Sequence, residues 1–193
     1  MIEQKNSNDL HRLIELTQSG NYQDALKLGL DLLTKNGKNS ILLNTLGIAF
    51  RRIGDIEKAT HFTKEALKYN PSFLPAKTAL ASIYLEKSEP RMAIEILEEI
   101  LYQDPRKGNA RINLAYAYKF LGKHKEALAQ YRLLVETNQK DFKGRFHLGL
   151  TEIAIGNFKE GWQQYEYRWK VKPFSEVKWP FAREEMWNNE EGK

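Results

Sequence analysis

The side chains that could carry out chemistry are few and scattered along the sequence. Four histidines occur, and none lies within three to five residues of another: His11, His61, His124 and His147. Metal sites built on helices need ligands at that spacing, so the pattern does not favour a metal centre. The chain has no cysteine, which excludes disulfides, thiol catalysis and cysteine-ligated zinc.

The sequence also lacks the patterns that hold cofactors or activate a nucleophile. It has no glycine-rich phosphate loop following a strand, and no serine nucleophile motif. We therefore predict no catalytic residue, no metal and no cofactor within residues 1–193. We expect this chain alone not to be an enzyme, while a catalytic domain beyond residue 193 is left open.

Composition and charge narrow the classes of partner. Hydrophobic residues make up 41% and charged residues 28% of the 193 positions, as in folded soluble proteins. The net charge of +5 is spread along the chain, whereas nucleic-acid binders concentrate it in a stripe. No apolar run reaches membrane-spanning length, and the first ten residues lack a signal-peptide core. We expect a cytoplasmic protein with no membrane partner, and nucleic acid is disfavoured.

The elements that must position any site are amphipathic helices in a fixed repeat. Residues 40–73 carry apolar side chains three and four positions apart, which is the spacing of one helix face. The pattern recurs every 34 residues, and three columns show it: a turn column of Gly20, Gly54, Ser88, Gly122 and Gly156; a small-residue column of Ala25, Ala59, Ala93, Ala127 and Gly161; and a closing column of Gly37, Pro71, Pro105, Gln139 and Pro173. A single helical hairpin cannot bury its apolar face alone, so the period indicates stacked units.

Positions within a repeat are counted here from Ser40 as position 1. Position 8 is small or apolar: Leu13, Gly47, Ala81, Ala115 and Gly149. Position 11 is large in four repeats and is Glu152 in the fifth. A small residue opposite a large one lets two helices approach closely where they cross, so each hairpin is expected to be tightly packed.

These residues resemble the tetratricopeptide repeat (TPR) family. Its 34-residue pattern is Trp-x2-Leu-Gly-x2-Tyr, then Ala-x3-Phe, then Pro. The clearest copies here are the following: Leu43-x2-Leu46-Gly47-x2-Phe50 with Ala59 and Pro71; Leu80-Ala81-x2-Tyr84 with Ala93 and Pro105; Leu114-Ala115-x2-Tyr118 with Ala127 and Tyr131. The resemblance implies an all-α fold, a right-handed α-solenoid of about five helix-turn-helix units. The repeats would be 6–39, 40–73, 74–107, 108–141 and 142–174.

The periodicity and capping residues predict ten helices. We expect first helices near 7–19, 41–53, 75–87, 109–121 and 143–155, and second helices near 22–35, 56–69, 90–102, 124–136 and 158–170. Asn21, Asp55 and Asn157 stand where second helices need an N-cap acceptor. Pro90 stands at a first helical position, where its missing N–H is not needed.

The resemblance also implies a binding groove lined by the first helices, at positions 2, 5, 9, 12 and 13. The candidate partner-binding residues are the following: Asn44, Ile48, Arg51, Arg52, Thr78, Ser82, Leu85, Ile112, Tyr116, Lys119, Phe120, Phe146 and Leu150. Tyr116, Phe120 and Phe146 would be aromatic anchors, and the three cations would contact acidic groups of a partner. The alternative is that several of these residues pack between adjacent first helices, or lie beneath the C-terminal tail.

Two specialised TPR grooves do not fit these positions. The type that clamps a C-terminal carboxylate uses Lys and Asn at positions 5 and 9, which here are mostly Leu, Ile, Thr, Ser and Phe. The type with an asparagine ladder needs Asn at position 6, which here reads His11, Thr45, Ala79, Asn113 and His147. The identity of a ligand therefore cannot be transferred from either type.

The C-terminal region departs from the repeat. All four tryptophans lie at or after Trp162. The segment Gly161-Trp162-x2-Tyr165-Glu166-x-Arg168-Trp169 resembles the end of the array in bacterial TPR proteins that continue into a glycosyltransferase-like domain. We expect a TPR array over 1–170 and a tail or junction over 171–193, with a short helix from Pro180. The tail would fold back on the last repeat or belong to a following domain.

The favoured hypothesis is a non-catalytic protein-interaction scaffold that holds a partner's protein or peptide segment in the groove. Two alternatives stay open. One is that the chain is the recognition arm of a larger glycosyltransferase-like protein. The other is that it self-associates, because an uncapped apolar end can stack on another copy to give a homo-oligomer.

Overall fold

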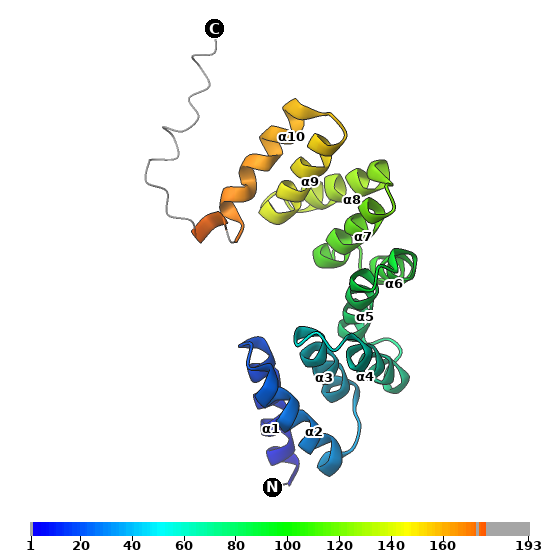
Figure 1. The fold of residues 1–193 in the computed structure, drawn as a ribbon, viewed down its shortest axis with the longest axis vertical. Coiled ribbons are helices and arrows are strands. Elements are labelled where there is room, and N and C mark those ends of the chain that lie inside the picture. Colours follow the sequence, from blue (N-terminus) through cyan, green and yellow to red (C-terminus); the bar gives the residue numbers. More distant parts are fainter. Residues whose placement is uncertain (1, 173, 177–193) are drawn as a thin grey trace. The chain divides into compact units, whose positions relative to one another are not determined.

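The computed structural model describes residues 2–172 and 174–176. Over these ranges the chain is helical, with ten α-helices, two short 3-10 helices and no strand (Figure 1). The first helices of the five repeats are α1 (Ile2–Gln18), α3 (Ser40–Arg52), α5 (Leu74–Glu86), α7 (Gly108–Phe120) and α9 (Phe142–Ala154). The second helices are α2 (Tyr22–Asn36), α4 (Ile56–Tyr69), α6 (Pro90–Gln103), α8 (His124–Thr137) and α10 (Phe158–Tyr165).

Eight of the ten helices lie within one residue of their predicted bounds. α1 begins earlier than predicted, at Ile2, because its first turns are polar and give no apolar periodicity. α10 was predicted to reach residue 170, but it ends at Tyr165 and continues as the 3-10 helix η1 (Glu166–Lys170). In this tighter turn the Arg168 guanidinium stacks on the rings of Tyr165, at 4.4 Å, and Trp169, at 4.3 Å. The second 3-10 helix, η2, spans Phe174–Glu176.

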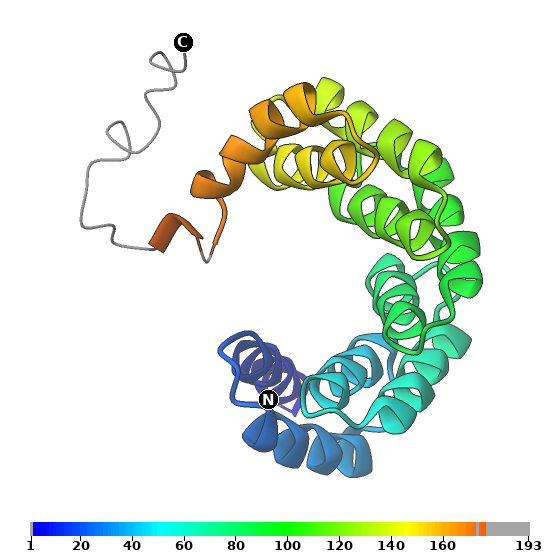
Figure 2. The same cartoon turned by 45° about the horizontal axis from the view of Figure 1, so that its top comes forward.

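The chain divides into two compact units, residues 1–130 and 131–193, which are described separately. In the first unit each helix from α1 to α6 contacts the next, and α1, α3, α5 and α7 also contact one another in series (Figure 2). First helices therefore form one continuous layer of this unit. In the second unit α9 packs against α10 and η1. The extent of the array, predicted as 1–170, stays a prediction.

The turn column has a conformational cause. All five residues adopt positive φ, between 60° and 89°, in the turn that joins the two helices of a repeat. Glycine enters this left-handed region without a steric penalty, whereas other residues do so at a cost. Ser88 occupies the same conformation at φ 60°. The 34-residue spacing of glycine therefore marks the same backbone turn in successive hairpins.

The small-residue column marks the crossing of the two helices in each repeat. Ala25, Ala59, Ala93 and Ala127 have no exposed surface. At the crossing of α9 with α10, Gly149 lies directly against the backbone of α10. A Cβ added to Gly149 would lie 2.7 Å from the Gly161 carbonyl oxygen and would also overlap the Tyr165 backbone nitrogen. The two backbones therefore touch, which no larger residue permits.

The helix N-caps agree with the prediction at one of three second helices. Asp55 accepts a hydrogen bond from the Lys58 N–H at 3.0 Å and caps α4. Asn21 and Asn157 occupy the cap positions of α2 and α10 but accept no capping bond. Asn39 and Asp141, which were not predicted, cap α3 and α9. Pro90 begins α6 as expected.

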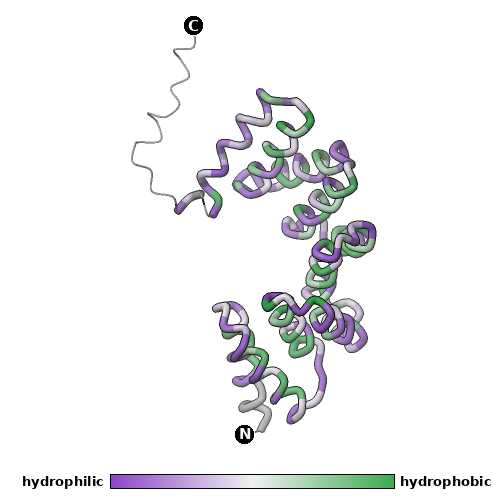
Figure 3. The backbone as a smooth tube through the Cα atoms, viewed as in Figure 1, coloured by the Kyte–Doolittle hydropathy of each residue, from purple (hydrophilic) through white to green (hydrophobic). Residues whose placement is uncertain are grey.

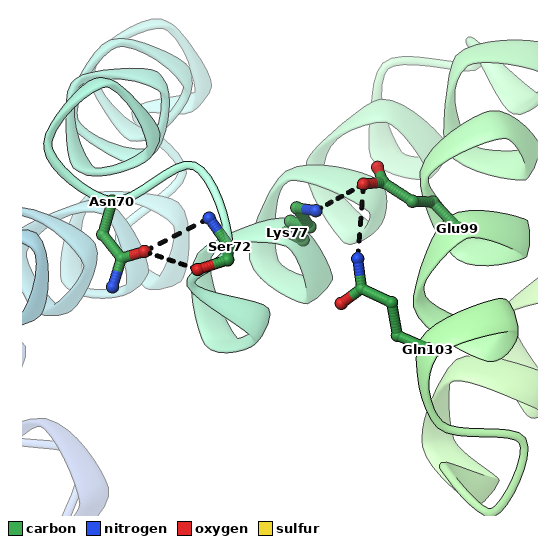
Figure 4. A network of polar contacts seen from close by, with 5 residues as sticks. All are labelled: Asn70, Ser72, Lys77, Glu99 and Gln103. Carbon is green, nitrogen blue, oxygen red and sulfur yellow. Dashed lines mark hydrogen bonds and ion pairs between the residues drawn. The ribbon is translucent and has the colours of Figure 1, made fainter.

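In repeats three, four and five, a basic side chain at position 4 of the first helix forms a hydrogen bond to the second helix of the same repeat. Lys77 of α5 donates to Glu99 of α6 at 2.6 Å, and Figure 4 shows this pair beside Gln103 and the Asn70–Ser72 turn. Arg111 of α7 donates to Gln130 of α8 at 2.8 Å, and also to the Pro105 carbonyl at 2.7 Å. Each cation therefore bridges the two helices of its own repeat, and Arg111 also holds the turn before it.

Arg145 of α9 repeats this arrangement in the second unit. It donates to Gln164 of α10 and to the Gln139 carbonyl, both at 3.1 Å. Arg111 is 7% exposed, and burial lowers the pKa of its guanidinium. An arginine nonetheless keeps its charge at neutral pH. These bonds therefore give each of the two guanidinium groups, buried Arg111 and half-buried Arg145, two hydrogen-bond acceptors.

Adjacent repeats also meet through position 11. Tyr118 of α7 donates its phenolic hydrogen to Glu98 of α6 at 2.7 Å. The equivalent pair one repeat earlier is Lys64 of α4 and Tyr84 of α5. The Lys64 ammonium lies 5.7 Å from the centre of the Tyr84 ring. The aromatic residue of position 11 therefore contacts the exposed side of the preceding second helix in both places.

Hydrophobic and hydrophilic residues alternate at short intervals along the helices (Figure 3). Among the described residues no helix combines the length and the apolar composition needed to span a bilayer. The short helix expected from Pro180, with Trp179 and Trp187 beside it, lies outside the described residues.

Substituting Gly149 tests the close crossing. Gly149→Ala should destabilise the second unit by about 1–3 kcal/mol, because its new methyl group meets backbone atoms that cannot move aside. Gly144→Ala in the same helix is the matched control, because its Cβ would meet the flexible Leu134 side chain. Thermal unfolding followed by circular dichroism measures both variants. Equal melting temperatures for the two would contradict the backbone contact.

Tyr118 gives a pH-dependent signature of the contact between repeats three and four. Burial, and then the hydrogen bond to Glu98, raise the pKa of Tyr118 from 10.0 to about 12. Because the neutral phenol is favoured in the folded chain, its contribution to stability should be complete below pH 10 and fall between pH 10 and 12. Denaturant unfolding of the native chain and of Tyr118→Phe over this range should show a smaller pH dependence in the variant. Identical slopes would refute the assignment.

Candidate partner-binding face

The candidate site is the surface that positions 9, 12 and 13 of α3, α5 and α7 form on the first unit, called here the first-helix face. Eleven of the thirteen predicted residues belong to these three helices. The other two, Phe146 and Leu150, lie on α9 in the second unit. The candidate face therefore consists of residues of the first unit.

Position 5 contributes less than predicted. Asn44 is 5% exposed and Ile112 is 8% exposed, so neither is available to a ligand. First helices pack against their own second helices and against neighbouring first helices, which leaves little of position 5 at the surface. The Asn44 Oδ1 atom is buried and has no hydrogen-bond partner among the described residues. The prediction that these two residues line an open groove is wrong.

Thr78 and Ser82 on α5 are half-buried, and their hydroxyl groups are engaged. Thr78 donates to the Leu74 carbonyl at 2.9 Å, and Ser82 donates to the Thr78 carbonyl at 3.0 Å. The Asn113 amide of α7 lies 3.5 Å from the Ser82 hydroxyl, which accepts its hydrogen bond. This part of the face joins neighbouring first helices and offers few free polar groups.

The three predicted cations differ in their surroundings. Arg51 of α3 pairs with Glu86 of α5 at 3.7 Å, so its charge is already compensated within the face. Arg52 is exposed and Lys119 is half-buried. Neither forms an ion pair with any residue in the described part of the chain. Burial lowers the pKa of Lys119, because its ammonium group is partly withdrawn from water without a counter-charge.

One surface hollow lies where α1, α2 and α3 meet. It measures about 260 Å³ and includes the predicted residues Ile48 and Arg52. The rest of its lining comes from the following residues: Ile14, Thr17, Gln18, Tyr22 and Thr45. The hollow thus combines apolar side chains, hydroxyl groups and an unpaired guanidinium, which suits an acidic side chain flanked by an apolar one.

A second hollow, of about 510 Å³, lies between the α5–α6 turn and the end of α7. Phe120 and Met92 line it and are 50% and 42% exposed. One turn before Phe120 on α7, Tyr116 is 51% exposed. Lys119 adjoins Phe120 in sequence, so two exposed aromatic rings and an unpaired ammonium come from one helix end. Leu85, predicted with them, is half-buried in the adjoining core.

Phe146 is packed within the second unit. Its ring centre lies 5.5 Å from that of Tyr165 on α10 and 5.3 Å from that of His147. Leu150, one turn later, is half-buried. These contacts favour a structural role for Phe146 through α10, which is neither the neighbouring first helix nor the C-terminal tail that the sequence analysis considered.

Sequence reasoning missed residues from turns and second helices. Tyr22 begins α2, and Pro90 and Met92 lie at the start of α6, yet all three line the hollows. The available signal was that Met92 is the one apolar residue at position 19, where the other repeats carry Asp24, Lys58, Glu126 and Glu160. Within residues 2–172 and 174–176, no group of three or more His, Asp or Glu side chains could hold a metal ion.

Comparison with known proteins agrees with the fold. The tetratricopeptide repeat family model matches residues 84–145. The human "Tetratricopeptide repeat protein 6" is 23% identical over 141 residues, covering 72% of this chain and 27% of that protein. The Pseudomonas aeruginosa "Type IV pilus assembly protein PilF" is 33% identical over 94 residues, covering 49% of this chain and 36% of that protein. The chain thus spans about a third or less of these relatives' length.

Solved structures of MamA share the architecture. A MamA double mutant superposes with a TM-score of 0.73 at 18% identity, over 86% of this chain and 93% of that one. MamA from Desulfovibrio magneticus RS-1 gives 0.72 at 19% identity, over 89% and 96%. Residues 84–145 are thus similar to the tetratricopeptide repeat family, and the described chain shares the all-helical fold of these MamA structures.

Proposed function

We propose that this chain is a protein-interaction scaffold and that the first-helix face holds a segment of a partner protein. The observation that carries the proposal is the pair of half-exposed aromatic rings, Tyr116 and Phe120, beside the unpaired Lys119 on α7. Exposed aromatic side chains supply most of the binding free energy at many interfaces, and a charge beside them selects the partner.

The charges of the face indicate an acidic and apolar segment. Arg52 and Lys119 lack ion pairs within the described residues. Arg52 lines the first hollow with Ile48, and Lys119 precedes Phe120 in sequence. A carboxylate from a partner would give these cations the compensation that Glu86 gives Arg51. Because the two cations belong to α3 and α7, an extended or helical segment that follows the layer of first helices would meet both.

The alternative that the chain is the recognition arm of a larger glycosyltransferase-like protein has narrower support. It rests on the segment from Gly161 to Trp169, and the curated relatives are longer than the matched region. Sequencing the gene beyond the codon for Lys193 decides this alternative. An open reading frame that encodes a nucleotide-sugar fold supports it, and a stop codon excludes it.

Substitution of the aromatic pair tests the scaffold proposal. Peptides selected on the chain from a random display library should be rich in Asp or Glu beside large apolar residues. Tyr116→Glu with Phe120→Glu should weaken binding of the selected peptide at least about tenfold, because it places like charge on the aromatic surface. Fluorescence anisotropy with the labelled peptide measures affinity, and circular dichroism checks that helicity is kept.

The matched control is Tyr69→Glu with Tyr102→Glu, which changes two exposed tyrosines on second helices. Their exposed fractions are 55% and 90%. The control should bind the peptide as the native chain does. If the native chain and the Tyr116/Phe120 variant bind the peptide equally well, the first-helix face is not the binding site.

The cations provide a separate prediction. Arg52→Gln and Lys119→Gln should each weaken binding of an acidic peptide and reduce its dependence on salt concentration, because a screened attraction is lost. Arg51→Gln is the control, since Glu86 already compensates that charge. Anisotropy titrations at low and high salt supply the comparison. If all three variants bind the peptide at low salt as tightly as the native chain does, an acidic partner is excluded.

A further inference from the structure

Two surface hollows of the first unit share a wall where α6 meets the end of α7. The hollow of about 510 Å³ described above is lined by Met92 and Phe120, and a neighbouring hollow of about 460 Å³ lies along α6. Arg91 and Leu121 line both hollows. The two hollows therefore adjoin, and a chain segment that leaves the larger one over this wall enters the smaller one.

The residues that line this edge depart from the repeat pattern. Met92 stands at position 19, where the other repeats carry charged residues, and Phe120 stands at position 13, where none of the others is aromatic. Lys123 lines the smaller hollow and directly precedes α8. It stands at position 16, which in the other repeats is polar or acidic: Asn21, Asp55, Glu89 and Asn157.

Lys123 is unfavourable for the helix that follows it. Asn and Asp at such a position can accept a hydrogen bond from the first turn, whereas a cation there is repelled by the positive end of the helix dipole. Departures from a local rule that carry such a cost are expected at functional sites. Met92, Phe120 and Lys123 come from three different elements and meet at one edge, which indicates a shared role in binding.

The lining of the larger hollow favours an aromatic side chain. Beside Met92 and Phe120 it includes Pro90, Leu121 and the exposed Arg91. A thioether and an aromatic ring each gain from contact with a second ring, and a guanidinium gains from lying over a ring face. An aliphatic side chain would gain only the burial of its surface. The hollow therefore selects an aromatic residue over an aliphatic one.

The charges of the smaller hollow favour a carboxylate at one end. Arg91 and Lys123 are exposed, and in the described part of the chain neither has an ion-pair partner. Glu95 and Glu98 lie one and two helical turns after Arg91 on α6, and Glu98 accepts the hydrogen of the Tyr118 hydroxyl. An acidic group at Arg91 and Lys123 would be compensated, whereas one farther along α6 would be repelled.

We propose that the partner segment crosses this edge, with an aromatic side chain in the larger hollow and a neighbouring Asp or Glu side chain at Arg91 and Lys123. The inference rests on the proposed function, because Phe120 belongs both to the first-helix face and to the larger hollow. It adds the class of the anchoring side chain. It also adds the course of the segment, which leaves the layer of first helices at the end of α7.

Met92 can report directly on the aromatic anchor. The chain has three methionines, so the spectrum of a sample with isotope-labelled methionine methyl groups is simple, and the signal missing from Met92→Glu belongs to Met92. The probe is the C-terminally amidated peptide selected by display on the native chain. Its ring current should shift the Met92 methyl signal upfield. The same peptide with Leu in place of its aromatic residue should not produce this shift.

Substitution of Met92 gives the matching affinity measurement. Met92→Glu should weaken binding of the selected peptide at least about tenfold in fluorescence anisotropy, because a carboxylate then lies at the aromatic anchor. Glu126 and Glu160 hold the equivalent position, so the fold tolerates the change. Leu133→Glu is the matched control and should bind as the native chain does. Leu133 is 41% exposed, against 42% for Met92, and acidic residues hold its equivalent position: Asp31, Glu65 and Glu99.

A double-mutant cycle tests the acidic contact. One change is Arg91→Gln with Lys123→Gln in the chain, and the other replaces the acidic residue nearest the peptide's aromatic residue by its amide. Each change alone should weaken binding about threefold or more. Both together should weaken it no more than the larger single effect, because they remove the same ion pair.

The outcomes separate this inference from the proposed function. An unmoved Met92 signal with native-like binding by Met92→Glu overturns the inference, as do selected peptides without an aromatic residue. If Tyr116→Glu with Phe120→Glu still weakens binding in these cases, the scaffold proposal stands alone. If none of these variants weakens binding, both proposals are wrong. Additive effects in the cycle contradict the contact of the acidic residue with Arg91 and Lys123.

Discussion

The close crossing of the two helices within each repeat is the constraint on which the remaining structure depends. A small residue at position 20 brings the second helix near enough for its apolar side chains to reach the first. Where both partners are glycine, at Gly149 and Gly161, the backbones themselves are in contact. This closeness leaves the opposite surface of the first helix to meet the neighbouring first helices, and so produces the layer that carries the candidate site.

Most of the helical architecture could be predicted from sequence because its causes are local. The turn column follows from a backbone conformation that glycine adopts freely, and Pro90 follows from the missing N–H at a helix start. Each signal recurs at a fixed spacing, so a weak copy is supported by stronger ones. Ser88 shows this, since its turn has the same geometry without glycine.

The features that sequence reasoning missed depend on contacts between repeats. Position numbers alone did not show that Asn44 and Ile112 are covered, because their burial depends on how neighbouring first helices pack. The Arg51–Glu86 pair joins two repeats and left Arg52 and Lys119 as the free cations of the face. The end of α10 was also missed, because Arg168 stacking on Tyr165 and Trp169 favours a tighter turn that helical periodicity does not encode.

The basic residues at position 4 have a consequence for how such a chain can change its length. Arg111 and Arg145 each bond to their own second helix and to the carbonyl group of the turn before them. A gene duplication or deletion of one complete 34-residue block keeps the spacing between each cation and both of its acceptors, because the carbonyl acceptor lies at position 32 of the preceding block in both cases. An insertion of one or two codons into a turn would separate the cation from its acceptor. The array is therefore free to evolve in whole blocks and is constrained against smaller steps.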